Sequence, residues 1–196
     1  MEKLHIIPHN HKITRVNRNK QNGHKSKVIW VVGLSGSGKS TIANVLEQQL
    51  FEKGVKTFLL DGDNIRVGLN SDLDFSMKSR SENIRRVGEV ANLMADAGLV
   101  CIVAFITPLK KDRDFVKSVV GKDNFIEVFV DCPIEVCESR DVKGLYEKAR
   151  RGEISNFTGI NSPFEAPQKP DVRIPSDEIS IDEGVEKVMK FLEKEL

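Results

Sequence analysis

The chain has 196 residues, of which 39% are hydrophobic and 30% are charged, which predicts one domain with a hydrophobic core of its own. The formal net charge of +1 excludes a general attraction to nucleic acid or to an acidic membrane, so we expect neither as a partner. No run of 18 apolar residues could span a membrane, and the first residues lack an apolar signal core, so a cytoplasmic location is expected.

Residues 1–27 are polar and basic and carry all four histidines of the chain. Two interpretations are open, namely a metal site and an arm that is flexible or packed on the surface. Because no cysteine or carboxylate cluster accompanies the histidines, we favour a basic N-terminal arm over residues 1–27.

A glycine-rich run lies between a predicted strand at residues 28–32 and a predicted helix at residues 41–50. It fits the phosphate-binding pattern G-x-x-x-x-G-K-[ST] and consists of Gly33, Leu34, Ser35, Gly36, Ser37, Gly38, Lys39, Ser40 and Thr41. Its glycines permit positive φ, so backbone N–H groups can converge on a polyphosphate at a helix N-terminus. We expect Lys39 to neutralise the β- and γ-phosphates of ATP and the Ser40 hydroxyl to bind Mg²⁺.

The rest of the chain alternates predicted strands with predicted helices. Strands are predicted at residues 57–61, 99–106 and 125–130, a helix at residues 81–97 and an amphipathic helix at residues 181–196. This alternation predicts an α/β fold, in which a parallel sheet has helices on both faces. Ligands of such sheets bind beyond the carboxyl ends of the strands.

Residues 152–175 break the alternation, with four prolines, two glycines and no clear periodicity. A long irregular segment inside a compact domain is typical of a functional lid. Phe157 and Phe164 argue against plain disorder. We therefore expect a single P-loop kinase-like domain over residues 28–196, with a proline-rich lid at about residues 145–175.

Two carboxylates and an arginine follow the second predicted strand, in the run Asp61-Gly62-Asp63-Asn64-Ile65-Arg66. Asp63 is expected to accept a proton from a substrate hydroxyl or to hold Mg²⁺ through water. Arg66 is expected to pair with a phosphate or sulfate group. An aspartate that caps a helix and forms a surface salt bridge is the open alternative.

A second anion-binding site is predicted at the start of the next helix. Arg80, Asn83 and Arg86 are spaced to share one helical face, and together with Arg85 the arginines outweigh the acidic residues there. Phe75, in the loop before this helix, either belongs to the core or stacks on a base.

Polar residues also follow the third and fourth predicted strands. Thr107 is expected to face the ligand crevice. Asp131 either occupies the position of the second magnesium-binding motif of P-loop proteins or marks a structural turn. The residues thus predict a small Mg²⁺- and ATP-dependent phosphotransferase with a second, anionic substrate. A gluconate- or shikimate-type kinase and a non-catalytic nucleotide-binding regulator are the alternatives.

Five blocks follow one another in a characteristic order: the phosphate loop, residues 61–66, residues 82–91, residues 141–146, and the lid pair 157–160 and 163–167. In order and spacing these blocks resemble the adenylyl-sulfate kinase (APS kinase) family over essentially the whole chain. The Asp-Gly-Asp-Asn and Phe-Thr-Gly-Ile blocks are the specific ones, because a phosphate loop alone is generic.

The resemblance implies ATP-dependent phosphorylation of the 3′-hydroxyl of adenosine 5′-phosphosulfate (APS), which gives 3′-phosphoadenosine 5′-phosphosulfate and ADP in sulfate assimilation. It also implies a homodimer. ATP is expected to bind the phosphate loop and Arg140, Mg²⁺ to bind Ser40 and Asp63, and catalytic roles are implied for Lys39, Asp63, Arg66 and Thr107. The residues implied for APS are Asp63, Arg66, Phe75, Arg80, Asn83, Ile106, Thr107, Lys143 and Phe157, with the two phenylalanines on either side of the adenine.

One departure from the family concerns Thr107, because the family usually carries a serine there that is sometimes named as a phosphoserine intermediate. The neighbouring sequence supplies no base that would activate a hydroxyl nucleophile. We therefore predict direct transfer from ATP, with Thr107 as a pocket wall and hydrogen-bond donor.

Overall fold

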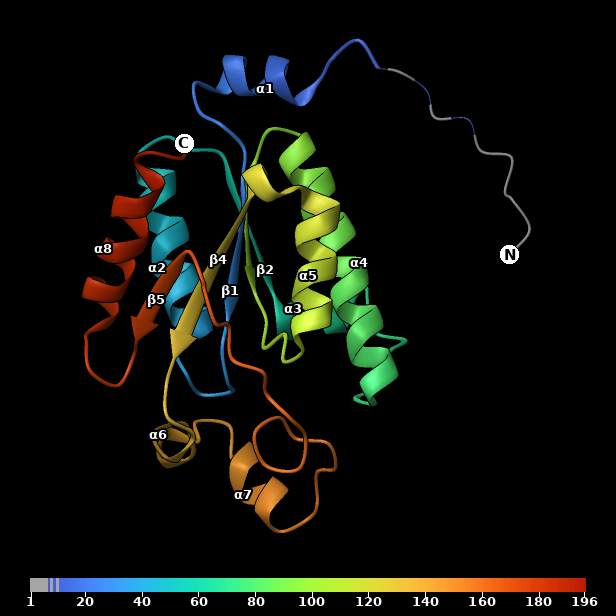
Figure 1. Ribbon diagram of the computed structural model, residues 1–196, viewed down its shortest axis with the longest axis vertical. Coiled ribbons are helices and arrows are strands. Elements are labelled where there is room, and N and C mark those ends of the chain that lie inside the picture. The colour runs from blue at the N-terminus through green and yellow to red at the C-terminus, as the bar shows by residue number, and fades with distance from the viewer. Residues whose placement is uncertain (1–6, 8, 10) are drawn as a thin grey trace.

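The computed structural model describes residue 7, residue 9 and residues 11–196, in which five parallel strands form one sheet (Figure 1). The order across the sheet is β2-β3-β1-β4-β5, and Trp30 of the central strand lies opposite Val103 on one side and Glu127 on the other. The strands are β1 (Val28–Val32), β2 (Thr57–Asp61), β3 (Val100–Ala104), β4 (Phe125–Asp131) and β5 (Val172–Pro175).

Helices cover both faces of the sheet, as predicted (Figure 1). One face packs against α2 (Lys39–Glu52) and α8 (Ile181–Leu192), and the other against α4 (Met77–Asp96) and α5 (Lys110–Val120). Strand β1 is buried from end to end, with Ile29 and Val31 in the first of these cores. The alternate residues Val28, Trp30 and Val32 lie in the second core. A strand enclosed on both faces is therefore a continuous apolar run.

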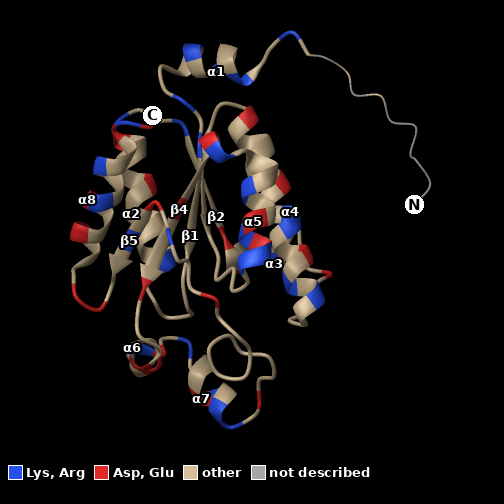
Figure 2. Cartoon of the chain, viewed as in Figure 1, with Lys and Arg blue, Asp and Glu red and all other residues tan. Residues whose placement is uncertain are grey.

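The other helices are short, and most of them lie at the ends of the sheet. They are α1 (Arg15–Asn22), α3 (Gly62–Val67), the 3₁₀ turn η1 (Lys122–Asn124), α6 (Ile134–Arg140) and α7 (Leu145–Arg150). Figure 2 shows lysines and arginines interspersed with acidic residues along α4, α5 and α8, in keeping with the balanced net charge. No helix of the described part is long and apolar enough to cross a membrane.

The described part of the expected N-terminal arm includes helix α1, which packs on the surface. Arg15 Nη2 donates to Asn92 Oδ1 at 3.2 Å, and Asn22 Nδ2 donates to the Gly98 carbonyl at 2.9 Å. The helix therefore lies across the end of α4 and the turn that follows it. Residues 1–6, 8 and 10 of the expected arm lie outside the described residues.

The expected lid consists of two parts. Helix α7 and the loop that follows it lie beyond the carboxyl ends of the strands, as does α6, which precedes the expected lid (Figure 1). From Phe164 the chain returns to the body, where Glu165 N donates to the Pro108 carbonyl at 2.8 Å and Arg113 Nη2 donates to the Glu165 carbonyl at 2.7 Å.

The expected lid boundary at about residue 175 is wrong, because residues 172–175 form β5. Val172 and Ile174 are buried in the core beside α8, and β5 pairs with β4. Pro170 and Pro175 made this short strand look like part of an irregular segment. Two other predicted elements are shorter than expected, since β3 ends at Ala104 and α8 ends at Leu192.

Candidate active site

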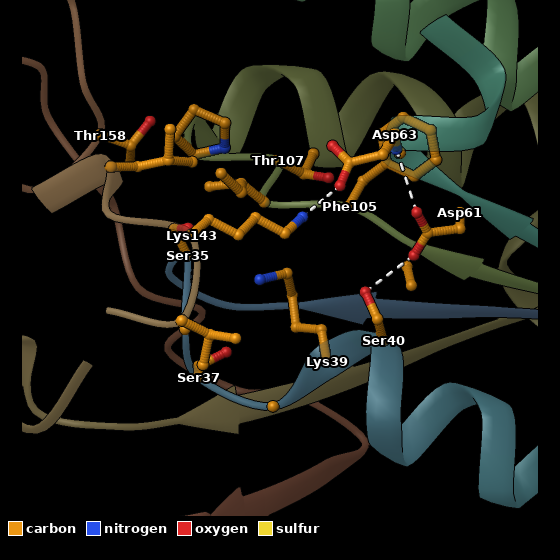
Figure 3. A pocket seen from close by; sticks show the side chains of 18 of the residues that line it. Ser35, Ser37, Lys39, Ser40, Asp61, Asp63, Phe105, Thr107, Lys143 and Thr158 are labelled. Atoms are coloured by element: carbon orange, nitrogen blue, oxygen red, sulfur yellow. Dashed lines mark hydrogen bonds and ion pairs between the residues drawn. The ribbon is translucent and has the colours of Figure 1, made fainter. Parts of the chain in front are cut away.

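The carboxyl ends of the strands open into a cavity of about 1130 Å³. Its walls come from the phosphate loop, the ends of β2 and β3, the start of α4, the lid and the segment after β5. Figure 3 shows polar side chains from the phosphate loop, the ends of β2 and β3 and the lid converging on it. Single small-molecule sites span ~300–1,000 Å³, so this cavity has room for two substrates side by side. Its lining includes every residue that the family resemblance implies for the site except Gly33 and Leu34.

The phosphate loop depends on glycines that other residues cannot replace. Gly36 has a φ of 74°, and a Cβ atom added to it would lie 2.9 Å from the Cys137 carbonyl oxygen. A Cβ atom on Gly33 would lie 2.5 Å from the Val130 carbonyl oxygen. The loop leads directly into α2, whose first N–H groups have no partner within the helix. This arrangement suits a polyphosphate at the helix N-terminus.

Two side chains inside the loop are placed so that they could donate hydrogen bonds to a bound anion. Ser37 Oγ is buried and has no hydrogen-bond partner among the described residues. Lys39 is buried and donates from Nζ to the Leu34 carbonyl at 2.5 Å. Burial lowers the pKa of the Lys39 ammonium to about 8. A phosphate beside it would stabilise the charged form, and so raise this pKa again.

Ser40 and Asp61 form the contact that best fits a magnesium ion. The Ser40 hydroxyl donates to Asp61 Oδ2 at 2.7 Å (Figure 3). Asp61 Oδ1 accepts from Asp63 N at 3.0 Å, so this carboxylate also caps α3. Hydroxyl and carboxylate oxygens are the ligands that Mg²⁺ prefers. The family resemblance implies Ser40 and Asp63 as the metal ligands, whereas Ser40 contacts Asp61 in the structure.

Asp63 projects toward the lid instead. Its carboxylate forms an ion pair with Lys143 Nζ across the cavity (Figure 3). Both side chains are more than half exposed. This contact joins the body of the domain to the loop between α6 and α7.

Asp131 takes no part in the cavity. Its carboxylate accepts from Arg173 Nε at 2.7 Å, and its backbone carbonyl accepts from Ser176 N at 2.9 Å. Of the two interpretations left open for this residue, the structure favours the structural turn.

The other half of the cavity combines cations with aromatic rings. Arg66 Cζ lies 4.4 Å from the ring centroid of Phe75, which is 62% exposed. Arg80 donates from Nη1 to Thr158 Oγ1 at 2.8 Å. Burial lowers the pKa of both the Arg66 and the Arg80 guanidinium, which marks a place where an anion would relieve the cost of burial. Phe157 packs edge-on against a buried tyrosine, with ring centroids 4.9 Å apart.

The expected excess of positive charge along α4 is wrong for two of its arginines. Arg86 pairs with Asp72 and Glu82, and Arg85 pairs with Glu82. Neither arginine lines the cavity. Sequence spacing placed Arg86 on the face of Arg80, but acidic residues one turn away and in the preceding loop compensate its charge.

Thr107 is buried and takes part in several hydrogen bonds. Its Oγ1 accepts from Trp30 Nε1 at 2.9 Å, and its backbone carbonyl accepts from Arg113 Nη1 at 3.0 Å. Its φ of 40° is unusual for a residue other than glycine. The bond from the indole uses one acceptor position of the hydroxyl, and the O–H stays available for the donation to a ligand that the sequence predicts.

The family model described as adenylylsulphate kinase matches residues 25–175. The adenylyl-sulfate kinase of Staphylococcus epidermidis is 51% identical, over 98% of this chain and 97% of that relative. The chain belongs to the adenylylsulphate kinase family. The solved APS kinase of Mycobacterium tuberculosis, a complex with AMPPNP and APS, is 49% identical with a TM-score of 0.83, over 86% of this chain and 98% of that one. The hexameric APS kinase of Thiobacillus denitrificans has 28% identity and a TM-score of 0.68, over 92% of this chain and 32% of that one.

One wall of the cavity was not predicted from the sequence. It is formed by the end of β5 and the segment that follows it. Ser176 Oγ donates to the Ser37 carbonyl at 2.8 Å, and Arg140 Nη2 donates to the Ser176 carbonyl at 2.8 Å. Because β5 was not recognised, its carboxyl end could not be counted among the strand ends that face ligands. The missed lining residues are Ile174, Ser176, Ile179, Ser180 and Ile181.

Proposed function

We propose that the chain transfers the γ-phosphoryl group of ATP to the 3′-hydroxyl of APS, and so forms 3′-phosphoadenosine 5′-phosphosulfate and ADP in sulfate assimilation. The observation that carries the proposal is one continuous cavity that joins a phosphate loop to a compartment of arginines and phenylalanines. Membership of the adenylylsulphate kinase family supports it, as does the relative solved with AMPPNP and APS.

The ATP half of the site consists of the phosphate loop from Gly33 to Thr41 together with Arg140 and Ser176. Lys39 pairs with the β- and γ-phosphates, and a phosphate oxygen accepts from Ser37 Oγ, which has no partner among the described residues. Ser40 and Asp61 hold Mg²⁺, with Asp63 beside them. When bound, the ion neutralises charge on the phosphates.

The acceptor half holds APS. Arg66, Arg80 and Asn83 bind the phosphosulfate group, where burial disfavours unpaired guanidinium groups. Phe75 and Phe157 lie on either side of the adenine. The remaining walls are Ile106, Thr107 and Lys143.

The transfer itself is direct. The 3′-oxygen of APS attacks the γ-phosphorus, the bond to the β–γ bridging oxygen breaks, and ADP leaves with that electron pair. The hydroxyl proton passes to Asp63, which Lys143 orients through their ion pair. Thr107 is not a nucleophile in this scheme, because its hydroxyl accepts from Trp30 and no residue of the described part of the chain is hydrogen-bonded to it as a base.

A coupled assay of ADP release tests the proposal. The purified chain is given MgATP alone, and then MgATP with APS, gluconate or shikimate. We expect rapid ADP release with APS only. Turnover with either sugar acid would favour the alternative kinases, and no turnover with any acceptor would favour a non-catalytic nucleotide-binding protein.

The proposal extends to a cytoplasmic location, where ATP is made, and to a homodimer. The described chain has no helix that could span a membrane, and a hexamer occurs in one relative. Sedimentation of the purified chain at several concentrations tests the dimer. A single species with the mass of one chain would contradict it.

The lid also belongs to the proposal, with its limits changed to residues 141–164, between the end of α6 and the point where Glu165 is bonded to the body. On binding of APS it closes over the cavity, which excludes water from the reacting phosphate. Limited proteolysis with and without APS and ADP tests the closure, and equal cleavage in both conditions would contradict it.

A further inference from the structure

Asn83, which we place among the residues that bind the acceptor, is held by a residue outside the cavity. Asn83 lies on α4, is buried and lines the cavity. Its Oδ1 accepts from Asn70 Nδ2 at 2.8 Å. Asn70 is fully buried in the turn between α3 and α4 and is not part of the cavity lining.

This hydrogen bond determines which end of the Asn83 amide is offered to a ligand. A side-chain amide has a donor end and an acceptor end. Asn70 occupies the acceptor end, and this is the one hydrogen bond of the Asn83 side chain among the described residues, so Asn83 Nδ2 is left without a partner there. The group that remains for the cavity is therefore an N–H donor, which suits the oxygens of an anion.

The turn that carries Asn70 is itself well fixed. Its backbone N–H donates to the Ile65 carbonyl at 3.0 Å, and its carbonyl accepts from Leu73 N at 3.1 Å. Its side-chain Oδ1 has no partner among the described residues, although it is completely buried. A buried acceptor without a partner is uncommon and calls for a reason.

The opposite arrangement of the two amides would pair this oxygen but leave Asn70 Nδ2 buried without an acceptor, and buried N–H groups without a partner are the rarer case. In that arrangement Asn83 Nδ2 would donate to Asn70 Oδ1, and Asn83 Oδ1 would face the cavity. The guanidinium of Arg80, one turn earlier on α4 and in the same cavity lining, would attract that oxygen when no ligand is bound. An anionic ligand would be repelled by it. The two amides thus form a pair with two arrangements, of which only the observed one suits an anion.

We propose that Asn70 is a positioning residue that makes the acceptor half of the cavity selective for an anionic group, by holding the Asn83 amide with its donor toward the ligand. This inference rests on the proposed function for the identity of the ligand, which is the phosphosulfate of APS. The orientation of the two amides does not depend on which anion binds. An experiment can therefore contradict the assigned orientation without contradicting the proposed substrate, and the reverse.

The decisive variant is Asn70→Asp, which changes the side chain by one atom. An ionised carboxylate can only accept, so it binds Asn83 Nδ2 and turns Asn83 Oδ1 toward the cavity. At pH 8.5 we expect KM for APS to rise roughly 10- to 150-fold, as for a lost hydrogen bond to a charged group. We expect KM for ATP and kcat to change less than twofold.

Lowering the pH should partly rescue this variant. Burial favours the protonated form of the introduced carboxyl, which can donate to Asn83 Oδ1 as Asn70 does. KM for APS should therefore approach the wild-type value as the pH falls toward 6. A residue that merely filled space would give no such pH profile. Asn44→Asp, an exposed change on α2, is the matched control and should leave both KM values unchanged at every pH.

The same Asn70 substitution in a variant that lacks the Asn83 amide shows whether Asn70 acts through Asn83. In Asn83→Ala, the further change Asn70→Asp should leave KM for APS unchanged, because the amide that it would turn is gone. Asn70→Leu should raise KM for APS without any pH dependence. An equal rise in both KM values, or an effect of Asn70→Asp that persists in Asn83→Ala, would overturn the proposal.

Exchange of side-chain amide hydrogens in the wild-type chain tests the proposal without any variant. Without ligand, the Asn70 NH₂ signals should be protected from exchange and those of Asn83 should not. APS with ADP should then protect Asn83. Protection of Asn83 in the ligand-free protein would overturn the assigned orientation. A correct ligand-free pattern with no response to APS would instead count against the proposed substrate.

Discussion

The two halves of the cavity differ in how they are built. The phosphate-loop half comes from nine consecutive residues, and Ser37 and Lys39 within it are almost fully buried. The acceptor half comes from α3, α4, the loop after β3 and the lid. Phe75 is 62% exposed there, and the ion pair between Asp63 and Lys143 is largely solvated.

This difference indicates that the two halves are completed at different times. The phosphate loop is held by the backbone of the folded chain, so it exists before any ligand arrives. The acceptor half has exposed side chains and few buried contacts across the cavity, which is typical of segments that order when a ligand binds. Substitutions in the first half should therefore affect catalysis, and substitutions in the second should affect mainly the affinity for the acceptor.

The largest effect is expected from Lys39→Ala in the fixed half. Loss of the ammonium removes charge stabilisation from the transferring phosphoryl group, so kcat should fall by about 10²-fold or more. The melting temperature should not fall, because a buried charge has been removed. Coupled kinetics and thermal unfolding measure both quantities. Near-normal turnover would mean that the phosphate loop is not the site of transfer.

The next largest effect separates the two aspartates at the boundary between the halves. Asp63→Asn should lower kcat by about 10²-fold with little change in KM, as expected for the loss of a proton acceptor. Asp61→Asn should mainly raise the Mg²⁺ concentration needed for half-maximal rate. Titration of Mg²⁺ at saturating substrates distinguishes them, and the reverse pattern would exchange their roles.

The aromatic residues test the acceptor half. Base stacking contributes about 1–3 kcal/mol, so Phe75→Ala should weaken APS binding roughly 5- to 150-fold and leave ATP binding nearly intact. Because the Phe75 ring is largely exposed, its removal should change the free energy of unfolding little. Phe157→Ala should weaken APS binding and also lower the melting temperature, because this ring packs on Tyr146. Equal losses for both nucleotides would argue against a separate acceptor compartment.

The pH dependence of ATP capture tests the burial of Lys39. Its pKa in the ligand-free protein is about 8, so the ammonium is progressively lost above that pH. kcat/KM for ATP should fall about tenfold for each pH unit above 8. The effect on stability has the opposite sign. Between about pH 8 and pH 10.4 the unfolded chain binds more protons than the folded one, so the free energy of unfolding of the ligand-free protein rises with pH as the buried charge is lost. Lys39→Arg should remove the falling limb.

The smallest effect is expected from Thr107→Val, which keeps the shape and removes the hydroxyl. The variant should retain at least a few per cent of activity, roughly the loss expected for one hydrogen bond. Trp30 Nε1 loses its acceptor, so stability should fall as well. Mass spectrometry after incubation of the wild-type chain with ATP alone should show no stoichiometric phosphothreonine. A phosphothreonine that is chased into product by APS would make Thr107 the nucleophile.

The difference between the contiguous phosphate-loop half and the acceptor half, which comes from distant segments, also explains what could be predicted from the sequence. Residues 28–50 contain a buried strand, the phosphate loop and the start of α2 in one contiguous stretch, so local patterns were sufficient. The contact between Ser40 and Asp61 joins residues 21 positions apart, and no spacing rule in the sequence shows it. Arg86 was misplaced for the same kind of reason, because its partner Asp72 lies in a loop whose path depends on the tertiary fold.

Strand β5 shows a second limit. It has four residues and ends in a proline, and its first residue, Val172, pairs with Val128 of β4, far earlier in the chain. Parallel strands pair with distant segments, so a short one leaves little local signal. Without β5, the sequence gives no reason to assign the following segment to the cavity, and residues 172–175 look like part of the lid.

The attachment of the lid at Glu165 affects the timing of each turnover. On the far side of this residue the chain is fixed to the body by Arg113, whose side chain also pairs with Glu127 and is almost fully buried. On the near side, an exposed ion pair such as that of Lys143 is worth only about 0–1 kcal/mol. Glu165 is thus the fixed end of the proposed lid, and the exposed ion pair of Lys143 opposes its opening by little. We therefore expect this contact to add no large barrier to departure of the product after the phosphoryl step.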